Sequence, residues 1–235
     1  MDLPLFYKQD IDDADNRLTL DEETSKHVVQ VLRMEPGELL RLTDGNGRLF
    51  TAEIVKDHKK HCEVKIIDST FSEYPARKIS IAISLLKNAS RFEWFLEKVT
   101  EIGIREIIPL ICERTEKQHF RYDRMKNICI SAMLQSQQVW MPTLPQPINF
   151  NSLFEKISYS QRLIAHCNEG EKPILSATME PTADSTLILI GPEGDFTSEE
   201  VALAGRNEFR PVSLGQTRLR AETAAVVAAA VLALG

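Results

Sequence analysis

The chain has 235 residues, of which 43 % are hydrophobic and 26 % are charged. Both fractions lie near globular averages, so disordered, collagen-like and coiled-coil classes are excluded. The 28 basic and 34 acidic side chains give a net charge of -6, which argues against a protein that coats nucleic acid by bulk charge. The length allows one large domain or two of unequal size.

No membrane span, export signal or metal motif is visible in the sequence. The longest apolar run, residues 224–234, has 11 residues, whereas a spanning helix needs roughly 20. The first residues lack a basic stretch followed by an apolar one, so we expect a cytoplasmic protein. The four cysteines lie far apart and are expected to be reduced and mostly buried, and no His or Cys cluster suggests a metal site.

Charge is uneven along the chain. Residues 1–75 carry a net charge of -6, residues 76–130 a net charge of +4, and residues 131–235 a net charge of -4. The basic middle block is either the solvated face of a helix or an anion-binding surface, and the charge pattern alone leaves both open.

The N-terminal third is predicted to be β-rich. Two stretches of alternating apolar residues flank Asp44-Gly45-Asn46-Gly47, and Asn-Gly supplies the positive φ angles of a tight hairpin turn. Residues 62–67 can add a third strand, and a short helix is expected at residues 25–32. A small domain resembling a β-barrel, with one helical insertion, is therefore expected.

After a predicted linker at residues 69–77, strands alternate with helices. Ser90 with Glu93 and Thr197 with Glu200 predict capping boxes, and Gly103 predicts a helix end. This alternation predicts a mostly parallel sheet with both faces covered. Strands are expected at 78–86, 105–111, 162–167, 186–191 and 212–215, and helices at 90–103, at 122–137, after Thr197, and at 222–234. The last helix is apolar all round, so it is buried either in the core or against a second copy of the chain.

The first motif that indicates chemistry is LILIGPEGDF, residues 187–196. An apolar strand runs directly into Gly191, Pro192, Glu193 and Gly194. Ligands bind at the carboxyl ends of strands in open α/β sheets, and glycines expose bare backbone to them. The segment is neither a dinucleotide fingerprint nor a Walker loop, so an ordinary Gly-Pro turn remains the alternative.

The second motif is VSLGQTRLRAETAAV, residues 212–226, in which a strand, a short polar loop and a helix follow one another. Arg218, Arg220 and Glu222 crowd the predicted helix N-terminus. The alternative is that Glu222 only complements the helix dipole while the arginines are solvated. Two further pairs, Lys98 with Glu101 and the neighbours Glu113 and Arg114, are by themselves more typical of surface ion pairs.

Four segments in order, LLKNASRFEWFLEKVTEIG, IIPLICERTEK, LILIGPEGDF and LGQTRLRAETAA, together resemble the 16S ribosomal RNA uracil-N3 methyltransferases of the SPOUT superfamily. The upstream segment HVVQVLR is similar to the N-terminal signature of that family. The resemblance implies an α/β fold with a PUA-like β-barrel over residues 1–72 that helps bind RNA. It also implies a SPOUT methyltransferase domain over residues 73–235 with a C-terminal trefoil knot, although chains usually avoid knots.

The same resemblance implies S-adenosyl-L-methionine as cofactor, 16S ribosomal RNA, within the small ribosomal subunit, as partner, and a homodimer formed through the knot region. We expect Arg220 to stabilise negative charge on the uracil, and Glu222, or a water it orients, to accept the N3 proton. The basic block is expected to bind RNA through Lys87, Arg91, Lys98 and Arg114, with Arg33 from the barrel. Expected cofactor residues are His166, Ile190, Gly191, Glu193, Gly194, Leu214, Gly215, Leu219, Arg220 and Thr223.

The sequence departs from the family pattern at two places. Asp195 stands where the family usually has glycine, and residues 134–138 read LQSQQ where the family commonly has Glu-Gln-x-Gly-Arg. Three alternatives remain open: another SPOUT RNA methyltransferase, a non-catalytic RNA-binding module on the same fold, and a Rossmann dehydrogenase, whose fingerprint is missing.

Overall fold

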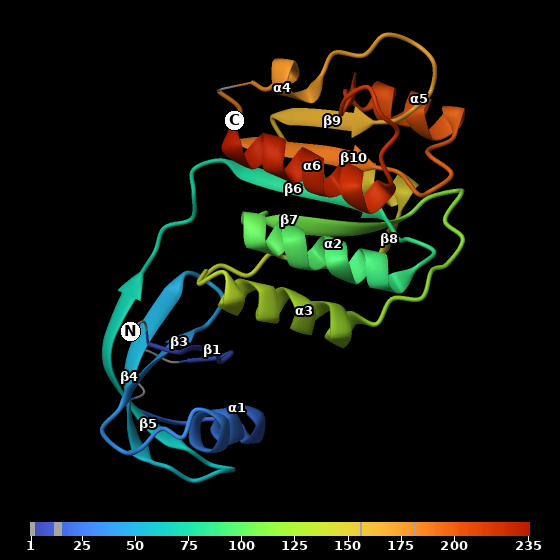
Figure 1. The fold of residues 1–235 in the computed structure, drawn as a ribbon. Coiled ribbons are helices and arrows are strands. Elements are labelled where there is room, and N and C mark those ends of the chain that lie inside the picture. Colours follow the sequence, from blue (N-terminus) through green and yellow to red (C-terminus); the bar gives the residue numbers. More distant parts are fainter. Residues whose placement is uncertain (1–2, 12–15, 156, 181) are drawn as a thin grey trace. The chain divides into compact units, whose positions relative to one another are not determined.

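The computed structural model describes residues 3–11, 16–155, 157–180 and 182–235 (Figure 1). The chain divides into two compact units. Unit 1 comprises Met1–Tyr74 together with Met133–Met141, and unit 2 comprises Pro75–Ala132 together with Pro142–Gly235. A segment that lies far along the chain therefore belongs with the N-terminal strands.

Unit 1 is built on a five-stranded sheet with the order β1-β3-β4-β5-β2. The predicted hairpin is confirmed as the antiparallel pair β3 and β4, and the predicted third strand as β5. The predicted helix begins earlier, at α1 (Glu22–Lys26), and continues as a π-helical turn (His27–Val31). The strands are β1 (Leu5–Tyr7), β2 (Arg17–Thr19), β3 (Leu39–Thr43), β4 (Arg48–Lys56) and β5 (Glu63–Phe71).

Trp140 fixes residues 133–141 to unit 1. Its indole Nε1 donates a hydrogen bond of 2.9 Å to the backbone oxygen of Ser72. Its ring makes edge contacts with Phe71 and Tyr74, at centroid distances of 5.9 and 5.4 Å. The ring also lies directly over Gly47, whose N–H donates to the oxygen of Val139 at 2.9 Å. The turn between β3 and β4 is thus packed against a tryptophan that comes from a distant segment of the chain.

Unit 2 contains a six-stranded, entirely parallel sheet with the order β11-β9-β10-β6-β7-β8. The predicted alternation of strands and helices is therefore confirmed. The strands are β6 (Lys78–Ser84), β7 (Glu106–Ile111), β8 (Ile148–Asn149), β9 (Gln161–Ala165), β10 (Ser185–Ile190) and β11 (Arg210–Val212). The helices are α2 (Ala89–Ile102), α3 (Tyr122–Gln135), α4 (Leu175–Thr178), α5 (Ser198–Arg206) and α6 (Ala221–Leu234), with a 3₁₀ helix at Phe150–Glu155. The last residues of α3, 133–135, are counted with unit 1.

Helices cover the sheet of unit 2. Helices α2 and α6 lie side by side, and α6 also contacts β6 and β10 (Figure 1). Helix α6 buries Ala225, Ala228, Ala229 and Leu232, so the core alternative is confirmed for that side of the helix. A cluster that includes Leu187 and Leu189 of β10 packs with Ala204 of α5 and Phe150 of the 3₁₀ helix. Successive side chains of a strand point to opposite faces, so α5 covers the face away from Ile188 and Ile190.

Local signals at helix ends were predicted with mixed success. The Thr197 and Glu200 capping box is confirmed, and Gly103 ends α2 in the left-handed region at φ 89°. The capping box expected at Ser90 is wrong. Helix α2 starts one residue earlier, because the side chain of Asn88 accepts the N–H of Ser90.

Several strand boundaries differ from the predicted ones, and three short strands were not predicted. Strand β5 runs to Phe71, so residues 69–71 are not linker, because they pair with β4. The strand expected at residues 212–215 is β11, at Arg210–Val212. It contains Pro211, which a sheet accepts at an edge, and β11 is an edge strand. The short strands β1, β2 and β8 have only two or three residues, too few for an alternating pattern to show.

We predict that Gly47→Ala destabilises unit 1 far more than Gly37→Ala. Both glycines have φ near +92°, so both substitutions incur the cost of a side chain at positive φ, about 1 to 2 kcal/mol. A Cβ on Gly47 would lie 2.4 Å from the Trp140 ring, whereas a Cβ on Gly37 meets nothing within 4 Å. Overpacking typically costs about 1 to 3 kcal/mol, so Gly47→Ala should lower the free energy of unfolding by about that much more than Gly37→Ala does.

Urea unfolding followed by Trp140 fluorescence, in a Trp94→Phe background, measures both variants. Equal losses of unfolding free energy for the two variants would show that the Trp140 ring does not restrict the space at Gly47.

Candidate functional site

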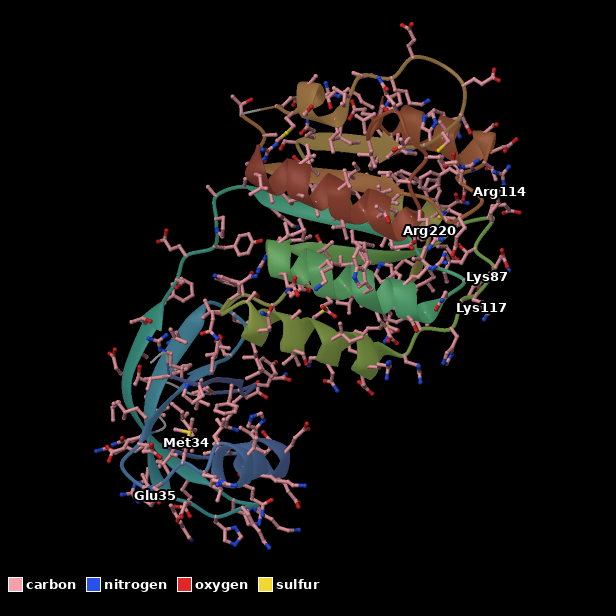
Figure 2. The ribbon with its side chains drawn as sticks, viewed as in Figure 1. Met34, Glu35, Lys87, Arg114, Lys117 and Arg220 are labelled. Atoms are coloured by element: carbon pink, nitrogen blue, oxygen red, sulfur yellow. The ribbon has the colours of Figure 1, made fainter. Side chains whose placement is uncertain are left out.

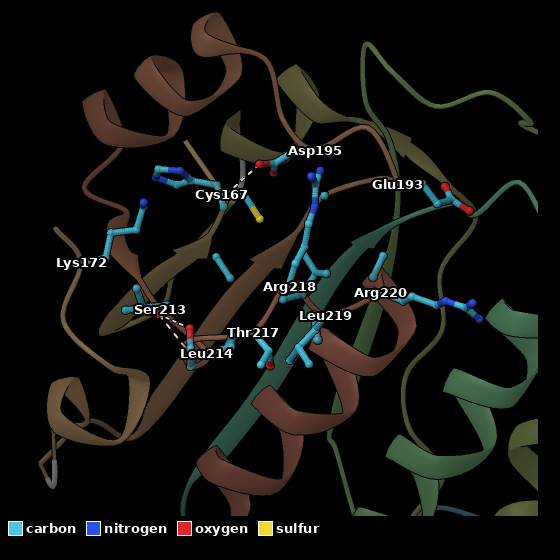
Figure 3. Close-up of a pocket in the computed structure, with 18 of the residues that line it drawn as sticks. Cys167, Lys172, Glu193, Asp195, Ser213, Leu214, Thr217, Arg218, Leu219 and Arg220 are labelled. Carbon is cyan, nitrogen blue, oxygen red and sulfur yellow. Dashed lines mark hydrogen bonds between the residues drawn. The ribbon is translucent and has the colours of Figure 1, made fainter. Parts of the chain in front are cut away.

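A cavity of about 770 Å³ opens in unit 2 at the carboxyl ends of three neighbouring strands (Figure 3). Its walls come from the loops after β9, β10 and β11, at residues 165–172, 190–195 and 212–221. Ala165 pairs with both Ile190 and Val212, so the three strands end level with one another. The parallel register therefore gathers both glycine motifs of the sequence at one site, as expected of a ligand site in an α/β sheet.

Gly191 allows the loop after β10 to fold tightly back on itself. A Cβ at this position would lie 3.1 Å from the ring and 3.1 Å from the backbone nitrogen of Phe196. The Phe196 ring is fully buried and packs on Phe150 at a centroid distance of 5.3 Å. The ring has no room to retreat, so only glycine fits here without a shift of the loop.

The loop after β11 turns at Gly215, whose φ of 132° favours glycine. The Ser213 hydroxyl accepts the N–H of Gly215 and donates to its carbonyl oxygen. Backbone bonds also join Ser213 to Pro173 and Leu175, at 2.9 and 2.8 Å, so the end of the β9 loop is attached to the β11 loop. Helix α6 then starts after Arg220 without a side-chain cap.

His166 lines the cavity with a ring nitrogen, Nδ1, that is buried and has no hydrogen-bond partner in the structure. Burial lowers the pKa of His166 from its ordinary 6.5, and Lys172 acts in the same direction while Asp195 opposes them. The neutral ring therefore offers a polar atom to a ligand.

Eight of the ten predicted cofactor residues line the cavity. The cavity is lined by His166, Ile190, Gly191, Glu193, Leu214, Gly215, Leu219 and Arg220, whereas Gly194 and Thr223 are not part of its lining. Lining residues that the sequence analysis did not select as cofactor residues include Cys167, Lys172, Asp195, Gln216, Thr217 and Arg218. Arg218 was noted in the sequence as a polar residue near the start of the last helix and Asp195 as a departure from the family pattern, whereas the others lie on the same loops as selected residues.

Two of the predicted RNA residues are attached to the Gly191–Gly194 turn. The Arg114 guanidinium donates a 2.7 Å hydrogen bond to the carbonyl oxygen of Gly194. The backbone N–H of Lys87 donates to the Glu193 carboxylate at 3.0 Å. Figure 2 shows Lys87, Arg114, Lys117 and Arg220 at the same end of unit 2. The loops after β6 and β7 thus bring cations beside the cavity.

Glu222 is buried at the start of α6, with 6 % of its surface exposed, and does not line the cavity. One carboxylate oxygen lies 3.6 Å from Nε of Arg91 on α2, and the other, Oε2, is buried without a hydrogen-bond partner. Glu222 therefore faces α2 and keeps one carboxylate oxygen unpaired.

Lys87, Lys98 and Arg33, also predicted to bind RNA, have different surroundings. Lys87 forms a 2.7 Å ion pair with Glu116, and this hydrogen bond raises the pKa of Lys87. Lys98 lies between Glu97 and Glu101, at 2.6 and 3.0 Å, so its charge is largely compensated. Arg33 belongs to unit 1 and has a positive φ of 56°.

Among the residues that the structure describes, no group of three or more His, Cys, Asp or Glu side chains is placed to hold a metal ion. Over the same residues, no helix is both long and apolar enough to cross a membrane.

Comparison with known proteins gives this site a family context. Residues 72–233 match the model of an RNA methyltransferase domain, and residues 20–67 match that of an RNA methyltransferase PUA domain. The chain is 31 % identical over 220 residues to the ribosomal RNA small subunit methyltransferase E of Synechocystis, covering 91 % of this chain and 71 % of that relative. The chain belongs to the ribosomal RNA small subunit methyltransferase E family.

Two crystal structures of similar proteins have the same fold over nearly the whole chain. A probable rRNA-methyltransferase from Porphyromonas gingivalis is 38 % identical with a TM-score of 0.88, covering 97 % of this chain and 95 % of that one. The methyltransferase E of Neisseria gonorrhoeae, bound to S-adenosyl methionine, is 29 % identical with a TM-score of 0.86, covering 97 % and 96 %. The family resemblance of the motifs is confirmed, and the dehydrogenase alternative is wrong.

We predict that Gly191→Ala destabilises unit 2 of this methyltransferase by about 2 kcal/mol, because the added methyl group overpacks the contact with Phe196. Gly205→Ala is the control. Gly205 lies in α5 with open space around its Cβ position, so alanine there should be neutral or stabilise by up to about 1 kcal/mol. Thermal unfolding followed by circular dichroism compares them, and a neutral Gly191→Ala would contradict the tight-turn interpretation.

Proposed function

We propose that the chain transfers a methyl group from S-adenosyl-L-methionine to N3 of a uracil in 16S ribosomal RNA of the small subunit. The observation that carries the proposal is the cavity formed by the two glycine loops beside exposed cations, in a chain of the methyltransferase E family. Loss of the gene should remove one N3-methyluridine from small-subunit RNA, measured by mass spectrometry. A different methylated atom would indicate another SPOUT activity, and no change would indicate a non-catalytic module.

The residues of the cavity fit this cofactor. The volume of about 770 Å³ lies within the usual range of small-molecule sites. Apolar walls from Ile190, Val212 and Leu214 suit a flat base, and the exposed backbone of the loops suits its polar edge. The unpaired Nδ1 of His166 offers a further polar contact. When bound, S-adenosyl-L-methionine supplies a methyl group on a sulfonium, which is reactive toward a deprotonated ring nitrogen.

The protein has to make uracil N3 nucleophilic, which requires loss of the N3 proton. Arg220 lines the cavity with an exposed guanidinium, and in our proposal it stabilises the negative charge that spreads onto the uracil carbonyl oxygens. Glu222, two residues on, does not line the cavity but keeps an unpaired carboxylate oxygen, and we assign to it, or to a water that it orients, the N3 proton. The uracil must leave its stack to reach these groups.

We also propose roles for the two domains, a knot, a dimer contact and a cellular location. The PUA domain, within the sequence-derived span 1–72, would hold RNA, with Arg33 as one contact, and residues 73–235 would carry the transfer. The segment through β11 into α6 would thread the trefoil knot. The partly exposed Val226, Val227 and Val231 of α6 support a homodimer contact in that region, which a monomer in sedimentation equilibrium would exclude. Action on 16S ribosomal RNA supports a cytoplasmic location.

We predict that Arg220→Ala and Glu222→Gln each lower the methylation rate at saturating cofactor by about 10²-fold or more, since each removes a group that acts on the developing charge or on the proton. Calorimetry with S-adenosyl-L-methionine identifies variants that still bind cofactor. Arg206→Ala on α5 is the control, because Arg206 is exposed and outside the cavity. Variants that bind cofactor and methylate at the parental rate would remove both assigned roles.

We predict that RNA binding weakens steeply with added salt and that Lys87→Gln lowers the slope of log affinity against log salt by about 1. The reason is that Lys87, Arg91 and Arg114 would each neutralise a backbone phosphate. Lys98→Gln should change the slope less, because two carboxylates, Glu97 and Glu101, compensate Lys98, whereas Lys87 pairs with one, Glu116. Filter binding of a small-subunit RNA fragment measures the slopes, and an affinity that does not vary with salt would show that this surface is misassigned.

A further inference from the structure

Asp195 adopts an unusual conformation at the edge of the cavity. Its φ is 64°, in the left-handed region that residues with a Cβ rarely adopt. It follows Gly194 in the motif of residues 187–196, and it stands where the family resemblance leads one to expect glycine. The loop therefore keeps a strained aspartate at a position whose backbone suits glycine, so a role for the side chain has to be sought.

The Asp195 carboxylate joins two loops of the cavity. Oδ2 accepts the backbone N–H of Cys167, 28 residues earlier in the chain, at 2.7 Å, and a dashed line marks this bond in Figure 3. Oδ1 accepts the backbone N–H of Phe196 at 2.8 Å, and the N–H of Asp195 itself donates to the oxygen of Pro192 at 2.9 Å. Each carboxylate oxygen thus holds a backbone donor, one in the loop after β9 and one in its own loop after β10.

The Cys167 contact complements the attachment at the other end of the same loop. Pro173 and Leu175 are bonded to Ser213, which belongs to the loop after β11. Within the loop, Lys172 donates to the carbonyl oxygen of Gly170 at 3.3 Å and to that of Asn168. The segment that carries His166 and Cys167 is therefore bonded to the β10 loop at its start and to the β11 loop at its end.

We infer that Asp195 is a positioning residue for the methyl donor. It holds the backbone of Cys167, and with it His166, against the loop after β10, so that the cavity has its shape before the cofactor enters. Both carboxylate oxygens accept backbone N–H groups, which is the contact a positioning role requires. The identity of the ligand rests on the proposed function. The tie between the two loops, by which we mean the hydrogen bond from the Cys167 N–H to the Asp195 carboxylate, does not depend on that function.

Three substitutions separate the effect of losing the tie from the effect of the backbone strain at positive φ. Asp195→Gly relieves the positive φ but removes the tie, and Asp195→Ala removes the tie while keeping the strain. Asp195→Asn keeps the side-chain shape but has one oxygen for two N–H donors, so one of the two bonds is lost. Asp184→Asn is the control, because Asp184 bonds to Ser160 and Ser185 at the amino end of β10 and is outside the cavity lining.

The first measurement needs no cofactor. Hydrogen exchange of residues 165–172, followed by mass spectrometry, should be about tenfold faster in Asp195→Gly and Asp195→Ala than in the parent, because the Cys167 amide loses its acceptor. Exchange in Asp184→Asn should match the parent in this segment. If Asp195→Gly and Asp195→Ala both exchanged at the parental rate, Asp195 would not hold the Cys167 backbone, and the inference would be overturned.

The second measurement is calorimetry with S-adenosyl-L-methionine, together with steady-state kinetics. We expect the dissociation constant and the KM for the cofactor to rise about tenfold in Asp195→Gly and Asp195→Ala, less in Asp195→Asn, while kcat at saturating cofactor stays within about twofold. Unchanged cofactor affinity, or a loss confined to kcat, would overturn the positioning role. A parent protein that bound no cofactor would instead refute the proposed function and leave the exchange result to decide on the tie.

Discussion

The parallel register of β9, β10 and β11 is the constraint on which the site depends. Ala165 is paired with Ile190 on one neighbour and with Val212 on the other, so the three chains leave the sheet in a single row. A parallel pair has no hairpin at this edge, and each strand must instead continue into a loop that leads away from the sheet. Three such loops side by side enclose the cavity.

The local charge near this edge matters more than the net charge of -6. The basic block around residues 76–130 was open to two interpretations, and the contacts of its members separate them. Lys98 is held by two glutamates of its own helix, which is the solvated-face interpretation. Arg114 and Lys87 are bonded to the turn after β10, which brings them beside the cavity. The solvated-face interpretation therefore applies to Lys98, while anion binding remains our proposal for Arg114 and Lys87.

Features specified by short-range geometry could be predicted from the sequence. The Asn46-Gly47 turn, the Thr197 capping box and the two glycine loops each depend on residues a few positions apart, so their patterns are visible in the chain. The attachment of Trp140 to the hairpin could not be predicted. It joins positions more than 60 residues apart, and no periodicity records such a contact.

The difference between short-range patterns and long-range contacts also explains why the site was predicted only in part. Gly191 was selected because glycine itself is the signal, and its tight contact with Phe196 is local. Asp195 was recorded only as a departure from a pattern, because its partner, Cys167, is 28 residues away. Glu222 was expected at the cavity but faces α2 and Arg91, since the direction of a side chain at the start of a helix depends on the neighbouring helix.

Some side chains of the cavity act through the backbone of its loops. The backbone donors and acceptors that meet a ligand are present whatever the sequence, so such side chains act by fixing where the backbone lies. Gly191 does so by leaving room, Ser213 by bonding to Gly215, and Asp195 by joining two loops. Binding to loops that are already fixed costs less ordering than binding to loose ones. A substitution at these positions therefore acts on the readiness of the site, even where the side chain never touches the ligand.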